Sequence, residues 1–291
     1  MTGDLPRLKP SPIPSICPVP EYLADERLRA VYEDTKSVLQ VPWMGVVTMA
    51  FAHYPAFYAA LWGGMREMAA TADFVAACRT LRDAAEREAE TLEAKTLVGE
   101  LRDHGYSDRE LDEIRDQIEI FSHGNMPYLL IATAARLLLE GHELSDRRQA
   151  KLFDGRHGPS NLNRLTLIEP HHADAPTQRV YDDIKATMGL PFVNTDYRAL
   201  ARWPSYFAMA WNDLRPHVDT DRYRGSSERV HDVAVGLVRD LANPGQLSSK
   251  QLRNAASKDG AIDETIDVVR LFQWLLPSLV VNVAYFRQQL A

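Results

Sequence analysis

Cysteine is scarce in this sequence. Its two cysteines, Cys17 and Cys78, stand far apart in 291 residues. Two isolated cysteines predict neither a disulfide framework nor a zinc site, and a reducing cytoplasm is the simplest compartment. The N-terminal segment also lacks an apolar run long enough for a signal peptide or a membrane span. We therefore expect a cytoplasmic protein that does not bind a membrane.

Positive charge and cofactor motifs are also lacking. The 33 Lys and Arg residues face 40 Asp and Glu residues, which gives a formal net charge of -7. Nucleic acid is excluded as the main partner, since phosphate binding needs a surplus of basic residues, but a small anion is not. No Gly-rich phosphate loop, Cys-x-x-Cys or Gly-x-Ser-x-Gly motif is present, so we expect no cofactor. The adjacent His171 and His172 stand in a polar segment, where solvated histidines are commoner than metal ligands, so we expect no metal.

What the sequence does contain is helical periodicity. Apolar residues recur three or four positions apart through most of the chain, and no period-two strands are evident. We predict an all-α fold. The predicted helices cover residues 23–39, 50–69, 74–104, a capped helix from 108, 126–140 (opened by Pro127), 175–189, 197–215, 226–242, 247–258 and 262–290.

Two segments interrupt this pattern. Proline recurs from Pro6 to Pro20, which predicts an extended N-terminal arm over residues 1–20, wrapping the fold or loose. Residues 141–170 are polar and rich in turn residues, which indicates a linker. Two helical units are therefore expected, over residues 21–140 and 171–291.

The two units resemble each other in sequence. At an offset of 149 residues, positions 31–68 and 180–217 share 11 identities in 38 positions, against two or three by chance. We therefore predict an internally duplicated pseudo-dimer, with two units packed about a pseudo-twofold axis and the active site between them. Matched residues such as Trp62 and Trp211 are expected in the core. Positions that differ in chemical type are expected to carry the function.

The two copies differ most clearly where a helix follows a proline. The first copy has Gly45-Val46-Val47, and the second has Asn194-Thr195-Asp196. Helix N-termini present free backbone N–H groups that suit a carboxylate. Asp196 is either a helix-capping acid or a lone carboxylate that acts as a base toward water.

Several segments resemble the group I 2-haloacid dehalogenases, in the same order along the chain. They are Tyr32-Glu33-Asp34 with Val41-Pro42-Trp43, Phe121 with Gly124-Asn125 and Tyr128-Leu129-Leu130, and Thr195-Asp196-Tyr197-Arg198-Ala199-Leu200-Ala201-Arg202-Trp203-Pro204. This family is all-helical, is a pseudo-dimer within one chain, and commonly forms a homodimer. The resemblance implies cofactor-independent hydrolysis of short 2-haloalkanoic acids to 2-hydroxyalkanoic acids.

The resemblance also implies roles for individual residues. Asp196 would activate a water molecule, and Asn125 would help to hold it. The water would attack the halogen-bearing carbon directly and invert it, without a covalent intermediate. Backbone amides around Trp43, Val46 and Thr195 would hold the carboxylate, while Trp43, Tyr128 and Phe272 would surround the halogen. An Asp with the ordinary pKa of about 3.9 is ionised at neutral pH and can accept the proton of water.

The side chain at position 194 bears on stereospecificity. Broad-specificity members of the family resemble this stretch with a small residue there, whereas D-specific members resemble it with Asn. A larger side chain two residues before the base would close the space that one enantiomer needs, so we expect D-specificity. His123, beside Gly124, either lines the pocket or has a local structural role. Glu67 either supports the site or is an exposed helical residue.

Two alternatives come from other classes of protein. The sequence around Leu190-Pro191 and Tyr197-Arg198-Ala199 also resembles helical units of the carboxymuconolactone decarboxylase and alkylhydroperoxidase-D type. Peroxidase chemistry there depends on a cysteine pair, which this chain lacks. The other alternative is a non-catalytic scaffold with a dry interface between its halves. A water-lined pocket at Asp196 would favour the enzyme.

Overall fold

The computed structural model describes residues 5–159 and 165–291. Within these ranges the chain is helical and has no β-strand; one isolated antiparallel bridge joins Thr71 and Leu152. The all-α prediction is confirmed. The elements of the first half are η1 (Glu21–Leu23), α1 (Glu26–Leu39), α2 (Val46–Phe51), α3 (Pro55–Ala69), α4 (Ala72–Glu90), α5 (Val98–Asp103) and α6 (Asp108–Leu139). Those of the second half are η2 (Pro170–His172), α7 (Ala175–Met188), α8 (Thr195–Leu200), α9 (Pro204–Val218), α10 (Asp221–Asp240), α11 (Ser249–Ala256) and α12 (Ile262–Gln288).

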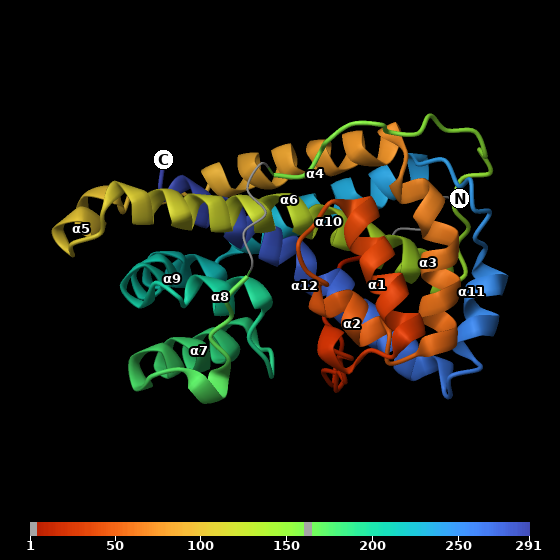
Figure 1. Ribbon diagram of the computed structural model, residues 1–291, viewed down its shortest axis with the longest axis horizontal. Helices are drawn as coiled ribbons and strands as arrows, with labels where there is room; N and C mark the ends of the chain where they lie inside the picture. The colour runs from red at the N-terminus through yellow and green to blue at the C-terminus, as the bar shows by residue number, and fades with distance from the viewer. Residues whose placement is uncertain (1–4, 160–164) are drawn as a thin grey trace.

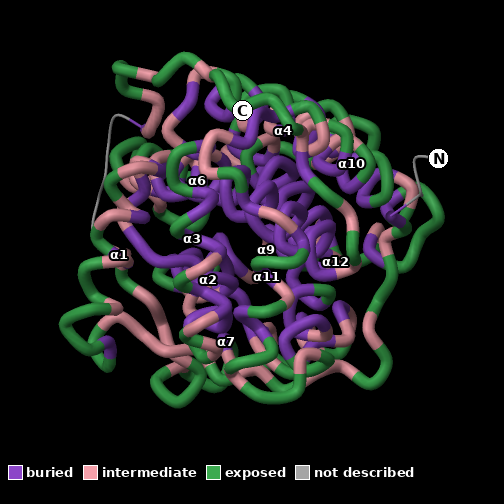
Figure 2. Tube along the Cα trace, turned by 90° about the vertical axis from the view of Figure 1, so that its right-hand side faces the viewer, coloured by how far each residue is buried: buried purple, intermediate pink, exposed green. Residues whose placement is uncertain are grey.

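The four longest helices form the middle of the molecule. Helices α4, α6, α10 and α12 all pack against one another, with α6 against α12 as the most extensive contact. In Figure 1, α1, α2 and α3 lie at one end of this layer, and α7, α8 and α9 lie at the other. Buried residues gather in the interior and exposed residues at the periphery, as Figure 2 shows. Helix α12 is long and apolar enough to span a membrane, but 83% of its most apolar window is buried within the protein.

The two halves exchange short helices. Helix α11 belongs to the second half in sequence but packs on α3 and α6 of the first half. In the other direction, Tyr106, which follows α5, accepts a hydrogen bond from the backbone amide of Tyr206 in α9 at 3.3 Å. Figure 1 accordingly shows α11 beside α3, and α5 near α9. The two sequence units are therefore intertwined rather than separate bodies.

The same local contacts recur in both halves at the offset of 149 residues. Three hydrogen bonds in the first half have an equivalent bond in the second half, and one of them is the bond to the Asp side chain that caps α1 or α7. The pairs are Trp62 Nε1 to Asp34 (2.8 Å) and Trp211 Nε1 to Asp183 (2.7 Å), Tyr32 Oη to Val19 O (2.8 Å) and Tyr181 Oη to Ile168 O (2.7 Å), and Leu28 N to Asp25 (2.8 Å) and Thr177 N to Asp174 (2.9 Å). We infer from these pairs that the chain is an internal duplication.

Prolines explain where the helix boundaries differ from the predictions. The expected helix over 50–69 is two helices, because Pro55 cannot continue a helix and holds Tyr54 at φ -107° and ψ 83°. The expected helix over 197–215 breaks before Pro204 in the same way. The expected helix over 74–104 is also interrupted, with Glu93 at φ 57° between α4 and α5.

Pro127 has the opposite outcome. We expected it to open a helix, but it lies inside the 32-residue helix α6, which begins with a capping box of Ser107 and Glu110. Pro277 lies inside α12 in the same manner. Both prolines are in fully packed stretches, where burial of neighbouring apolar side chains outweighs the lost backbone hydrogen bond.

The N-terminal arm and the linker are extended segments that lie on the helices. The arm wraps the fold from its first described residue: Leu5 is buried and its carbonyl accepts from His231 Nε2 at 2.6 Å. In the linker, Gln40 Oε1 accepts from the amides of His157 and Gly158 at 2.8 and 3.0 Å. Residues 1–4 of the arm and 160–164 of the linker lie outside the described residues.

Candidate active site

One small cavity lies where the starts of α2 and α8 meet α6 and α12. Its volume is about 30 Å³, enough for a water molecule. All but Val46 and Phe192 of the lining residues are buried. The lining residues are Trp43, Gly45, Val46, Val47, Asn125, Tyr128, Phe192, Asn194, Thr195, Asp196, Phe272, Leu275, Leu276 and Leu279.

The backbone that leads into α8 places Asp196 in the cavity. Helix α7 ends at Met188 and is followed by Gly189, whose φ of 62° favours glycine. Asn194 is the N-cap residue of α8 and is extended at φ -64° and ψ 156°. Asp196 therefore occupies the second helical position rather than the cap. An acid there is favoured by the helix dipole. Asp196 is nevertheless only 3% exposed, and a favourable helix position alone does not explain why a carboxylate is buried.

Asp196 has one close side-chain partner. Asn125 Nδ2, on α6, donates to Asp196 Oδ1 at 2.6 Å. An ionised carboxylate has about four acceptor positions, so this bond leaves room for a water molecule to donate to the same group. The pair thus joins a proton acceptor to a polar group that can orient that water.

Burial determines the protonation behaviour of Asp196. Loss of solvent raises its pKa to about 6, and this outweighs three influences that lower it: the Asn125 hydrogen bond, its own backbone amide and the charge of Arg198. The carboxylate is therefore a stronger base than an exposed Asp, yet remains mostly ionised at neutral pH. That combination suits a group that removes a proton from water.

Two helix N-termini face the cavity from opposite halves. Gly45 is the N-cap residue of α2 and Asn194 is the N-cap residue of α8, and both are extended. Gly45 has no side chain, and the side chain of Asn194 makes no capping hydrogen bond. The amides of each first turn have no backbone carbonyl partner within their own helix. The cavity therefore offers backbone N–H groups to an anion without a Lys or Arg among its lining residues.

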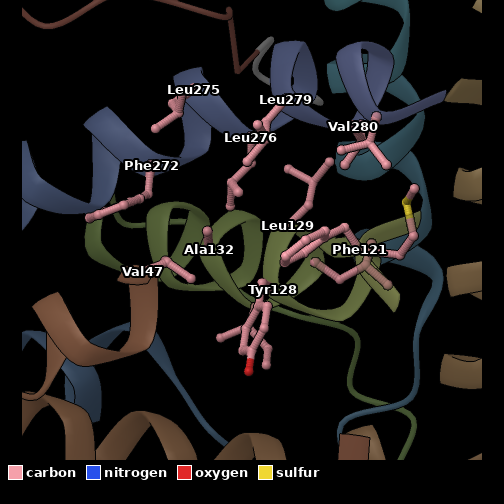
Figure 3. Close-up of a cluster of buried hydrophobic side chains, with 14 of the residues drawn as sticks. Val47, Phe121, Tyr128, Leu129, Ala132, Phe272, Leu275, Leu276, Leu279 and Val280 are labelled. Carbon is pink, nitrogen blue, oxygen red and sulfur yellow. The ribbon is translucent and has the colours of Figure 1, made fainter. Parts of the chain in front are cut away.

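Aromatic and aliphatic side chains form the rest of the wall. Tyr128 Oη donates to Trp43 O at 2.7 Å, and the two rings meet edge to face at 5.9 Å between centroids. A Cβ added to Gly45 would lie 2.8 Å from the Tyr128 ring, so the ring packs directly on this backbone. Figure 3 shows Phe272 and the leucines of α12 packed toward α6, with Val47 of α2 beside α6 in the same apolar cluster.

The structure brings the eight predicted site residues to this one cavity; their roles stay predictions. Six further residues line the cavity. Gly45 and Val47 belong to the stretch that the sequence singled out, but they were given no role. Four others were not predicted, because periodicity does not tell which apolar residues of a core helix face a cavity. Phe192 had a signal, since it is the counterpart of Trp43 at the repeat offset. The missed residues are Phe192, Leu275, Leu276 and Leu279.

The other candidates lie elsewhere. His123 is on α6 but faces a separate cavity of about 110 Å³ that it shares with His157 and Cys78. Its partly buried ring stays neutral at pH 7, because burial lowers its pKa to about 4. Glu67 and the pair His171 and His172 are exposed. Among the described residues no cluster of three or more His, Cys, Asp or Glu could hold a metal ion.

Comparison with known proteins agrees with this site. Residues 42–190 match the family model described as halocarboxylic acid dehydrogenase DehI. An (R)-2-haloacid dehalogenase of Rhizobium sp. (strain NHG3) is 45% identical over 88% of this chain and 99% of its own length. A second (R)-2-haloacid dehalogenase, of Pseudomonas putida, is 37% identical over 94% of this chain and 92% of its own. A solved D-2-haloacid dehalogenase in complex with L-LA superimposes with a TM-score of 0.87 at 35% identity, over 99% of this chain and 100% of that one. These matches favour the dehalogenase prediction over the peroxidase-like and scaffold alternatives, and the chain belongs to the DehI family of 2-haloacid dehalogenases.

Proposed function

We propose that the protein hydrolyses short 2-haloalkanoic acids of the D configuration to 2-hydroxyalkanoic acids, with inversion at the reacting carbon. The observation that carries the proposal is the buried Asp196–Asn125 pair in a small, mainly apolar cavity. The names of the relatives, which are (R)- and D-2-haloacid dehalogenases, support the substrate class.

The proposed reaction is a direct displacement by water. A water molecule held by Asp196 and Asn125 gives a proton to the Asp196 carboxylate as its oxygen bonds to C2 of the substrate. The C2–halogen bond breaks on the opposite face, the bonding pair leaves with the halide, and the carbon is inverted. Holding the water and substrate in line is a proximity contribution, and the base adds roughly 10² to 10⁴ in rate.

The substrate carboxylate is proposed to sit between the starts of α2 and α8. The backbone amides near Trp43, Val46 and Thr195 are the donors at that place. Phe272 and the aromatic pair Trp43 and Tyr128 then surround the halogen, which leaves as a stable anion without acid assistance.

The test follows halide release and product chirality together. The purified protein is incubated with each enantiomer of 2-chloropropionate and 2-bromopropionate. Halide from the D-form, with L-lactate as product, supports the proposal. A single turnover in H₂¹⁸O distinguishes the routes, because direct attack places the label in lactate at once, whereas an Asp ester would place it first in the protein. Absence of halide from a folded protein with all four substrates would refute the function.

Assembly and location remain proposals as well. We propose a homodimer in solution and a cytoplasmic location, on the family resemblance and the lack of cysteine pairs. Light scattering coupled to size-exclusion chromatography tests the first, since a mass near 32.8 kDa would exclude the dimer. Fractionation of the native cells tests the second.

A further inference from the structure

Arg198 connects a surface carboxylate to the wall of the cavity. It lies on α8, and its side chain is only 15% exposed. Its Nη1 donates to both oxygens of Glu169 at 2.7 Å, and its Nη2 donates to Thr195 Oγ1 at 3.1 Å. One mostly buried guanidinium therefore fixes a side chain that lines the cavity.

These polar contacts occur in one half only. The three residues that form them have apolar counterparts in the first half at the same offset of 149 residues. The counterparts are Pro20 for Glu169, Val46 for Thr195 and Met49 for Arg198. The polar contacts are thus present in the half that carries Asp196 and absent from the half that carries Val47.

The surrounding backbone has the same arrangement without these contacts. In the second half the amide of Ile168 donates to Arg198 O at 3.0 Å, and in the first half the amide of Val19 donates to Met49 O at 2.9 Å. The two halves therefore hold their extended segment against the short helix in the same way, with or without a guanidinium. The backbone hydrogen bond already holds the two segments together, so the side chains of Arg198 and Glu169 are not needed for that purpose. We therefore expect their role to be at the cavity.

The hydrogen-bonding capacity of the Thr195 hydroxyl indicates this role. A Thr hydroxyl has one proton to donate and two lone pairs that accept. Arg198 occupies an acceptor position of Thr195, so the Thr195 proton remains available for another partner. Thr195 is the first residue of α8, where the backbone amides have no carbonyl partner within the helix. Hydrogen bonds from several donors to one anion strengthen its binding.

We propose that Arg198 is a positioning residue that holds the Thr195 hydroxyl as a hydrogen-bond donor to the carboxylate of the bound acid. The inference rests on the proposed function for the identity of that acid. Glu169 is its anchor, because it holds the guanidinium from the solvent side. A second consequence concerns Asp196: burial raises the pKa of its carboxyl, and the Arg198 charge acts against that rise.

The test is a double-mutant cycle on Thr195→Val and Arg198→Met, which install the residues of the first half. The probe is propionate, which has the carbon skeleton and carboxylate of the substrate but no halogen, and its Kd is measured by titration calorimetry. Each single variant should weaken binding about tenfold, as loss of a hydrogen bond to a charged group does. The double variant should be no weaker than the weaker single variant, because both changes remove one interaction. Unchanged affinity in either single variant, or effects that multiply in the double variant, would overturn the inference.

Further variants separate this role from general damage. Thr195→Ser keeps the hydroxyl and should retain wild-type affinity. Arg198→Lys keeps the charge without the fork, so it should weaken propionate binding but leave the acid limb of kcat/KM in place. Arg198→Met should move that limb to higher pH. Arg66→Met removes an ion pair with Asp34, neither of which lines the cavity, and should bind propionate as the wild type does. If Arg198→Met does not fold, Thr195→Val against Thr195→Ser still decides whether the hydroxyl contributes.

Because propionate binding needs no turnover, the two proposals fail differently. A wild-type protein that binds propionate but releases no halide from any 2-haloacid refutes the reaction and leaves the positioning role to the cycle. A wild-type protein that releases halide while the cycle shows no coupling refutes the positioning role alone.

Discussion

Asn125 Nδ2 lies 2.6 Å from Asp196 Oδ1, and this bond joins the interior of α6 to the first turn of α8. The two residues are 71 positions apart and come from different halves of the chain. The site is therefore assembled only when the halves are packed together. Asn125 and Asp196 can be replaced separately, which makes the contribution of each side chain measurable.

Replacing Asp196 by Asn should remove the base while keeping the shape of the side chain. We expect the rate of halide release to fall by about 10² to 10⁴, the usual contribution of a positioned base. The measurement is kcat on D-2-chloropropionate by halide release. Asp183→Asn is the matched control, since that carboxylate pairs with Trp211 and Arg215 outside the cavity. Wild-type turnover by the Asp196 variant would exclude the residue as the base.

Activity should depend on pH through the same carboxyl. The base works only when ionised, and its pKa in the substrate-free protein is raised to about 6, so kcat/KM should fall as the pH drops through that value. Asn125→Ala removes a hydrogen bond that lowers this pKa, and the acid limb of kcat/KM should therefore move to higher pH. A pH profile of both proteins with one substrate provides the measurement. A limb that stays in place in the variant would show that Asn125 does not stabilise the ionised form.

Asp196 should also destabilise the folded protein at neutral and basic pH. A carboxyl whose pKa rises from 3.8 to about 6 on folding costs roughly 3 kcal/mol above the folded pKa, and nothing below the unfolded one. Asp196→Asn should therefore raise the free energy of unfolding by up to about 3 kcal/mol at pH 8. The gain should shrink as the pH falls below 6. Urea denaturation at pH 8 and at pH 4.5 gives the comparison; an equal effect at both pH values would contradict the linkage.

Stereospecificity should depend on the side chain at position 194. Asn194 lines the cavity two residues before Asp196 and makes no capping hydrogen bond, so its truncation leaves the start of α8 intact. Asn194→Ala should allow turnover of L-2-chloropropionate and retain turnover of the D-form. The ratio of kcat/KM for the two enantiomers is the measurement. An unchanged ratio in a folded variant would count against the steric explanation.

The close approach of Tyr128 to Gly45 should make this glycine sensitive to the smallest substitution. Gly45→Ala would place a methyl group 2.8 Å from the ring. The ring must shift, at a cost of about 1 to 3 kcal/mol in stability, and the KM should rise because the ring borders the cavity. Gly63→Ala is the control: nothing lies within 4 Å of its added Cβ, and it is within α3, where Ala is favoured by about 0.5 to 1 kcal/mol. Thermal unfolding of both variants measures the change in stability. A Gly45→Ala variant as stable as Gly63→Ala would contradict the prediction.

The sequence repeat was the most informative source of prediction. It indicated which positions differ between the halves, and the cavity lies at the stretch where Val47 faces its counterpart Asp196. The repeat could not show that α11 crosses to α3, because helix exchange leaves the apolar pattern of each helix unchanged. The repeat also did not distinguish Leu275 and Leu276 in the cavity wall from the other buried residues of α12, because an apolar pattern does not show which residues border a cavity.

Proline gave correct and incorrect predictions for one physical reason. Proline disfavours the interior of a helix. This preference sets the helix boundary at Pro55, but at Pro127 the packing of a long buried helix overrides it. The connection of Arg198 to Thr195 was also beyond the sequence. A spacing of three on a helix permits such a contact but does not require it.

Val47 and Asp196, which are equivalent positions in the two halves, line the same cavity. A symmetric pair of identical units could not provide this difference, and would be unsuited to the reaction. Exact two-fold symmetry would place either two carboxylates in the cavity or none. Two would share one proton near neutral pH, since like charges in a dry site cannot both ionise. A displacement reaction instead needs one face of the carbon reserved for the attacking water and the opposite face reserved for the departing halide. Joining the two units in one polypeptide lets residue differences between the halves, above all Val47 against Asp196, supply that polarity.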